Sequence, residues 1–181
     1  MGGSQRTSEL RLPTMSVAVR LALVGAPPAA VEMFVPEVPR TGRGQLFDDI
    51  AAQLEGDARF LPVRTASRVR LIGKHAIAWV AIARQAPDAP PPPAQATLAA
   101  EPASEAPEEL TLFDHQHFVE IELAHGTKLI GTLLDSAPAD RSRVIDHLNR
   151  AGRFLRLWTT DQHYLIQAIQ VVAVTELGEV W

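Results

Sequence analysis

A long internal repeat constrains this chain more than any other feature of its sequence. Residues 153–174, moved back by 94 positions, lie on residues 59–80 with seven identities among the 22 aligned positions. Most of the remaining pairs exchange one apolar residue for another, as Val63 and Leu157 do. The identical pairs are Arg59 and Arg153, Phe60 and Phe154, Leu61 and Leu155, Thr65 and Thr159, Leu71 and Leu165, Ile72 and Ile166, and Val80 and Val174. Such a repeat indicates one supersecondary unit used twice, so we expect a duplicated small module.

The pattern of apolar residues predicts the same order of elements in both copies. Apolar residues alternate over residues 17–23, which is the period of a half-buried strand. Apolar residues spaced three and four apart within residues 43–54 predict a helix. The other strands expected in the first copy are residues 31–35, 60–63, 68–72 and 77–81. In the second copy we expect strands at residues 118–123, 128–134, 154–158, 163–167 and 171–176, and a helix at residues 140–149 that Asp140 caps.

A segment of different composition separates the two copies. Residues 85–109 hold seven of the fourteen prolines, mixed with alanines and acidic residues. Such a segment buries too little apolar surface to offset the entropy of ordering it, so we expect an extended linker. A plain tether and a polyproline ligand for a partner domain both fit this composition. The expected organisation is a flexible arm (1–14), module 1 (15–84), the linker (85–110), module 2 (111–177) and a tail (178–181).

Five short strands and one helix in about 70 residues are too few for a β-sandwich and suit a strongly bent barrel. We therefore expect a mostly β protein of two tandem five-stranded small barrels. The segments LIGKHAIAWVAI (71–82) and YLIQAIQVVAV (164–174) resemble the end of Sm-like and SH3-like small barrels, where a tight turn joins strands four and five. The segment GTKLIGTLL, followed by DHLN and FLRL, is similar to bacterial modules of this type.

The resemblance implies a place for RNA, because Sm proteins hold it at a basic turn between strands four and five. The matching residues are 73–75 (Gly-Lys-His) in module 1 and 167–169 (Gln-Ala-Ile) in module 2. The second turn has neither the glycine nor the basic residue. The implied RNA site is therefore restricted to module 1.

Charge is distributed unevenly along the chain. The net charge is +4 over residues 1–84, −5 over residues 85–110 and −3 over residues 111–181. The basic side chains that gather in the strands of module 1 are Arg64, Arg68, Arg70 and Lys74. A basic strand face binds phosphate backbones, but Trp79 is the one aromatic residue in that stretch on which a base could stack. A solvated face, or an interface with the acidic module 2, is the reading that the asymmetry favours.

We expect neither a metal site nor a bound cofactor. His115 and His117 would share one face of a strand, but no third ligand follows at a recognisable spacing. The chain has no cysteine, which excludes disulfides and thiolate metal sites. Residues 42–44 (Gly-Arg-Gly) lack the Gly-Lys-Ser/Thr run that holds nucleotide phosphates.

We expect no enzymatic activity either. Asp48 and Asp146 occupy equivalent places in the two helices, which indicates a shared role. No second polar group is repeated beside them, so a catalytic pocket is not indicated. A hydrogen bond to a turn, or an ion pair with Arg59 and Arg153, is the simpler role.

Aromatic residues are few and predict contacts. The candidates for an interface are Trp79, Trp158, Tyr164 and Trp181. Tryptophan often contributes much of the binding energy when it is buried at an interface. Phe60 and Phe154, kept in both copies, are expected in the core, each where its module's helix meets the barrel.

The function predicted from the sequence is that of a non-enzymatic binding or scaffold protein. A protein partner or self-association through exposed strand edges is the expected mode. The alternative is an Sm-like single-stranded nucleic-acid-binding protein that uses the basic residues of module 1. No apolar run is long enough to span a membrane, and residues 1–10 lack the apolar stretch of a secretory signal, so we expect a cytoplasmic protein without membrane contact.

Overall fold

The computed structural model describes residues 14–37, 44–66, 68–84, 115–135 and 143–179. Most of the expected arm, the linker, Asp140 and Trp181 lie outside these residues. Residues 14–84 are called the first half below, and residues 115–179 the second half.

The first half contains five strands, one α-helix and one 3-10 turn. Its elements are β1 (Thr14–Leu23), β2 (Ala29–Pro36), α1 (Gly44–Glu55), β3 (Phe60–Thr65), β4 (Arg68–Gly73), η1 (Lys74–Ala76) and β5 (Ile77–Ala83). The helix and all five strands lie where the apolar periodicity predicts them, with bounds one to three residues wider for most.

The second half repeats this order. Its elements are β6 (His115–Leu123), β7 (Lys128–Asp135), α2 (Val144–Arg150), β8 (Phe154–Trp158), β9 (Gln162–Gln167), η4 (Ala168–Gln170) and β10 (Val171–Glu179). Helix α2 begins at Val144, four residues after the predicted start of the helix, and Arg143 is its N-cap residue.

Local backbone features also recur between the halves. The turn after β1 contains Gly25 with φ 74°, and the turn after β6 contains Gly126 with φ 82°. Glycine adopts this left-handed region without steric cost, so each turn needs it. The pairing of β5 with β1 skips Ala78, and the pairing of β10 with β6 skips Val172, which is the equivalent residue. The same β-bulge thus marks the last strand of each half.

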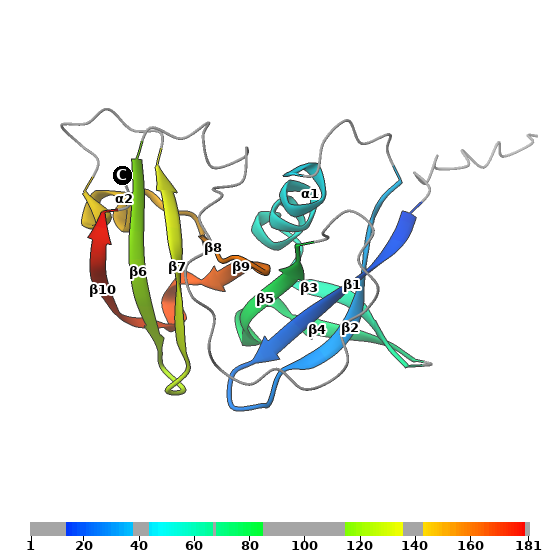
Figure 1. Ribbon diagram of the computed structural model, residues 1–181. Coiled ribbons are helices and arrows are strands. Elements are labelled where there is room, and N and C mark those ends of the chain that lie inside the picture. The colour runs from blue at the N-terminus through cyan, green and yellow to red at the C-terminus, as the bar shows by residue number, and fades with distance from the viewer. Residues whose placement is uncertain (1–13, 38–43, 67, 85–114, 136–142, 180–181) are drawn as a thin grey trace, which may run out of the picture.

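All ten strands belong to one open antiparallel sheet, in the order β10-β6-β7-β8-β9-β5-β1-β2-β3-β4 (Figure 1). The expectation of a mostly β protein is confirmed. Two separate closed barrels are not seen among the described strands, because the second neighbour of β5 is β9 from the other half. Figure 1 shows the halves side by side, with β9 extending to the first half. The five strands of each half remain contiguous within the sheet.

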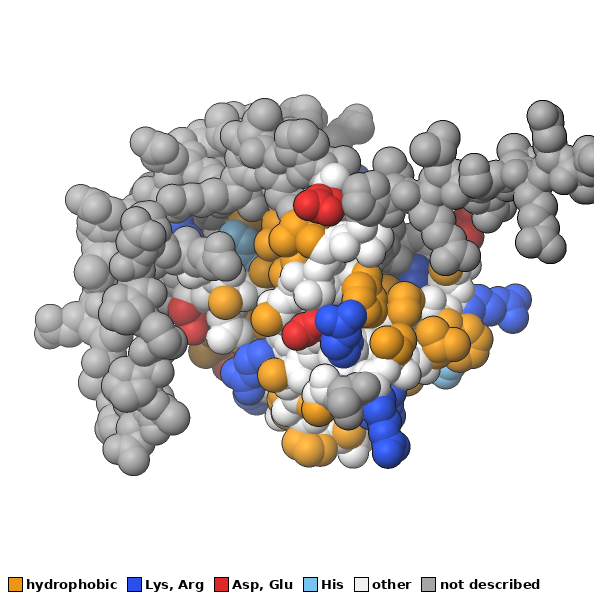
Figure 2. All heavy atoms as spheres, turned by 90° about the vertical axis from the view of Figure 1, so that its right-hand side faces the viewer, with side chains coloured by type: hydrophobic (Ala, Val, Ile, Leu, Met, Phe, Trp, Pro, Cys, Tyr) orange, Lys and Arg blue, Asp and Glu red, His pale blue; other side chains and the backbone are white. Residues whose placement is uncertain are grey.

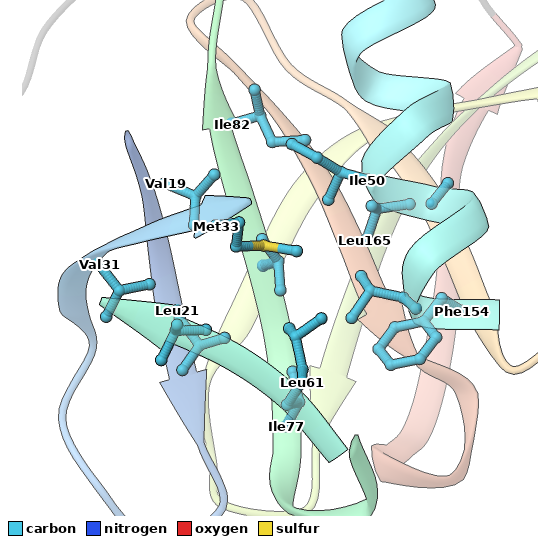
Figure 3. Packing of buried hydrophobic residues seen from close by; sticks show 14 of the residues in the cluster. Val19, Leu21, Val31, Met33, Ile50, Leu61, Ile77, Ile82, Phe154 and Leu165 are labelled. Carbon is cyan, nitrogen blue, oxygen red and sulfur yellow. The ribbon is translucent and has the colours of Figure 1, made fainter. Parts of the chain in front are cut away.

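The hydrophobic core consists of two clusters, and each contains residues from both halves. The first contains α1 residues such as Ile50 together with Phe154 and Leu165 of the second half (Figure 3). The second contains Ala78 and Trp79 of the first half among residues of β6 to β9. Burial of apolar area is the main stabilising term in folding, so these shared clusters stabilise the contact between the halves.

The repeated phenylalanines have different environments, and the expectation of a core position is wrong for Phe60. The Phe154 side chain is 5% exposed, whereas that of Phe60 is 57% exposed. Helix α1 of the first half contacts β8 and helps to cover Phe154. Phe60 lies on β3, next to the end of the sheet, where no further strand of the described chain follows β4.

Candidate interaction surfaces

The contact between the halves, called the junction below, is centred on the pairing of β5 with β9. In this register Trp79 lies opposite Ile166, and Val80 lies opposite Leu165. The Trp79 side chain is buried and meets the Tyr164 ring edge-on, with 5.4 Å between ring centroids. Two of the aromatic residues expected at an interface therefore pack against each other across the internal junction.

A second set of ring contacts joins helix α1 to the second half. The Phe47 ring centroid lies 5.1 Å from that of Trp158 and 5.4 Å from that of His163. The Trp158 and His163 rings contact each other at a tilt of 59°, with their centroids 4.0 Å apart. Partial burial of the imidazole, with a smaller contribution from the nearby Arg84 charge, lowers the pKa of His163 to about 4. The His163 ring is therefore neutral at pH 7 and packs as an aromatic group.

Polar contacts from α1 position the start of β8. The Glu55 carboxylate accepts hydrogen bonds from the backbone amides of Arg153 at 3.1 Å and Phe154 at 2.8 Å. A Cβ added to Gly152 would lie 2.7 Å from the same carboxylate, so a larger residue there would displace the Glu55 side chain from these amides. The end of α1 and the start of β8 are thereby held in a defined geometry.

Asp48, one of the two repeated helix aspartates, forms an ion pair across the junction. Its Oδ1 lies 2.7 Å from Nη1 of Arg156, and both side chains are largely exposed. An exposed pair of this kind contributes about 0–1 kcal/mol, so it aids orientation more than stability. The partner is Arg156 and not the repeated Arg153.

The four basic residues expected to form one face are divided by the structure. Val63, which is buried, lies opposite Arg70, so Arg68 and Arg70 share the side of β4 that faces the core. Arg64 belongs to the opposite side of the sheet, where it bonds Glu32 at 3.1 Å and covers the Phe34 ring. Arg68 and Arg70 are themselves exposed, because they lie on the last strand of the sheet.

Lys74 is a structural residue. Its side chain is buried, and its ammonium donates to the carbonyls of Gln53 and of Gly56, the latter at 2.8 Å. These carbonyls lie at the C-terminal end of α1, where backbone oxygens lack helical partners. Burial, and then repulsion from the Arg153 charge, lower the pKa of Lys74. The Sm resemblance implied that Lys74 contacts RNA. In the structure Lys74 instead connects the end of α1 to the turn after β4 by hydrogen bonds.

The two ends of the sheet form the other candidate surface. Among the described residues β4 is bonded to β3 alone, and β10 to β6 alone. Val69 and Leu71 of β4 and Val172 of β10 are exposed. Figure 2 views the molecule from the side of the first half and shows hydrophobic side chains interspersed with basic ones. An apolar edge strand of this kind is a template for pairing with another chain.

The described residues hold no group of three or more histidine or acidic side chains that could bind a metal ion. His117 is buried, with its Nδ1 3.3 Å from a carboxylate oxygen of Glu176 on β10. His115 is partly exposed at the start of the same strand. No helix in this part of the chain is long and apolar enough to cross a membrane.

Comparison with protein-family models, with curated proteins and with solved structures finds no match for this chain.

Sequence reasoning selected the aromatic residues of the junction but missed the polar ones and Phe47. Phe47 is one of the apolar residues that predict the helix within residues 43–54, but the sequence does not reveal its neighbours in the second half. Glu55 has no acidic counterpart in the second copy, so the repeat does not distinguish it from other acidic residues. The repeat is the sequence feature that bears on the junction. It makes β9 the equivalent of β4, and β10 the equivalent of β5.

Proposed function

We propose that this chain is a non-enzymatic binding or scaffold protein that acts through protein–protein association. We take the five contiguous strands of each half as one small-barrel module, and the two modules as products of an internal duplication. The repeated order of elements, the paired turn glycines and the shared β-bulge support this origin.

The observation that carries the proposal is the apolar character of the two end strands. Natural sheets protect their edges with charges, prolines or covering segments, because exposed backbone N–H and C=O groups pair readily with other strands. Strand β4 carries Arg68 and Arg70 on one side but exposes the apolar Val69 and Leu71 on the other, and β10 exposes Val172. Addition of a strand at such an edge is a common mode of protein recognition.

Single-stranded nucleic acid is the second candidate ligand, and the exposure of Arg68 and Arg70 on one side of β4 favours it. Two arginines give few phosphate contacts, so the affinity should be weak and should fall steeply with salt. Fluorescence anisotropy with a labelled oligonucleotide measures it. Sub-micromolar binding at physiological salt that Arg68→Glu with Arg70→Glu abolishes would favour this candidate over protein association.

Photo-crosslinking in cells tests the main proposal. p-Benzoylphenylalanine replaces Leu71, Val172 or, as a matched control, Ile130, which is an exposed apolar residue of the internal strand β7. We expect protein adducts from positions 71 and 172 that exceed those from position 130. Adducts to nucleic acid alone, or equal labelling at all three positions, would contradict protein association through the edges.

A further inference from the structure

The junction inside one chain provides a template for a contact between two chains. Strand β9 is the equivalent of β4, and β10 is the equivalent of β5, both at an offset of 94 residues. Strands β9 and β5 are paired within the chain, whereas β4 and β10 are the two ends of the sheet. Each end thus offers one side of the contact that the junction already makes.

The burial of equivalent residues shows what each end lacks. Leu165 on β9 is fully buried against β5, while its equivalent Leu71 on β4 is 70% exposed. Ala78 on β5 is fully buried, while its equivalent Val172 on β10 is 65% exposed. Both exposed side chains occupy positions that the junction buries.

The helices and the repeated phenylalanines show the same difference. Phe47 on α1 is 3% exposed and packs on Trp158 and His163 across the junction, whereas Ile145 at the matching place on α2 is 57% exposed. Phe60 is exposed where Phe154 is covered by the neighbouring half. Phe60 on β3 and Ile145 on α2 are thus exposed, whereas their equivalents Phe154 and Phe47 are buried at the junction.

Charge complements this geometry. Strand β4 carries Arg68 and Arg70, and β10 carries Glu176. Over the first half the net charge of the sequence is positive, and over residues 111–181 it is negative. Opposite charges on neighbouring edges favour their encounter and disfavour the pairing of like edges.

We propose that a second copy of this chain occupies the edge, with β4 of one molecule pairing antiparallel with β10 of the next in the register of the junction. This proposal rests on the proposed function and names its partner. The junction pairs Val80 with Leu165, so the intermolecular register places Val174 opposite Leu71. By the same offset Thr175 lies opposite Arg70.

The contact joins two different surfaces, so one molecule of a pair retains an open β10 and the other an open β4. Such head-to-tail contacts form rings when the rotation between copies closes and filaments when it does not. The partner copy also brings Ile145 of its α2 toward Phe60, as α1 brings Phe47 and Glu55 toward Phe154 and Trp158 in the junction.

Blocking one edge at a time tests this arrangement by sedimentation velocity on the purified chain. We expect the wild type to sediment as assemblies larger than one chain, and Leu71→Glu and Val172→Glu each to sediment as single chains. An equimolar mixture of the two variants should form a 1:1 dimer, since each retains the edge that the other has lost. Ile130→Glu should assemble like the wild type.

Disulfide trapping tests the register, because the chain has no cysteine of its own. Opposite residues in antiparallel strands lie within disulfide distance. Mixing Leu71→Cys with Val174→Cys chains should give a disulfide-linked dimer under mild oxidation. Leu71→Cys with Thr175→Cys should give little, because those side chains lie on opposite faces.

The outcomes separate this proposal from the broader one. A wild-type chain that sediments as a monomer at all concentrations, or edge variants that still assemble, would overturn the self-pairing. If crosslinks from positions 71 and 172 then join other proteins, the scaffold function stands with a different partner. If they join no protein, both proposals fail.

Discussion

Replacing each repeated phenylalanine by alanine compares two identical residues in equivalent local sequences. Phe154→Ala removes a side chain that is 5% exposed and lies in the first core cluster, among residues of the first half such as Ile50. Phe60→Ala removes one that is 57% exposed on β3. Local sequence predicts equal effects, whereas the tertiary structure predicts unequal ones.

The difference in burial gives the size of the effect. An aromatic side chain offers roughly 200 Å² of surface, of which Phe154 buries about 190 Å² and Phe60 about 85 Å². At about 25 cal/mol per Å², the losses of unfolding free energy are roughly 5 and 2 kcal/mol. Because the unfolded chain already buries part of this area, the difference of about 2–3 kcal/mol is the better figure.

Thermal unfolding measures this difference. Both variants are made in the Leu71→Glu background, so that self-association does not stabilise either of them. We expect Phe154→Ala to melt about 5–10 °C below Phe60→Ala, given about 2–4 °C per kcal/mol for a chain of this size. Equal losses, or a larger loss for Phe60→Ala, would refute the assignment of Phe154 to the junction and of Phe60 to an open surface.

Three further predictions concern the junction and α1. His163 binds its proton with a pKa of about 4 when folded and near 6.5 when unfolded, so stability should fall by about 1–2 kcal/mol, after allowance for solvent screening, as the pH drops from 6.5 to 4. Urea unfolding should show a smaller decrease for His163→Gln; an unchanged pH dependence would contradict the shift. Lys74→Met should cost about 1.5–3 kcal/mol because two helix carbonyls lose a charged donor, and a neutral effect on thermal unfolding would exclude that role. Cleavage at a protease site inserted within residues 90–106 should leave the halves co-eluting, since β5 and β9 pair across the junction; separation into two folded pieces would show that the halves are independent.

The sequence was sufficient to place the elements. Alternation of apolar residues in β1 and their helical spacing in α1 are local properties, and the glycines in the two turns allow a conformation that other residues rarely adopt. The repeat then predicted the second half from the first. These features depend on residues that are close in sequence, so no knowledge of the fold is needed to read them.

The candidate site was predicted only in part. Trp79, Tyr164 and Trp158 were selected as contact residues, and they lie at the junction. The basic face of module 1 was not recovered as one surface, because Lys74 is buried under α1 and Arg64 lies on the other side of the sheet. Whether a lysine binds a ligand or donates hydrogen bonds to a helix end depends on which carbonyls approach it from distant parts of the chain.

Tertiary structure alone decided which strands are neighbours. Backbone N–H and C=O groups are the same in every strand, so an edge does not encode its partner, and β5 was as free to close on β4 as to pair with β9. The pairing with β9 buries Leu165 and Phe154 and leaves their equivalents Leu71 and Phe60 exposed. The same residue in the same local pattern is thus core in one half and surface in the other, because burial depends on what lies beside a strand and not on the strand itself.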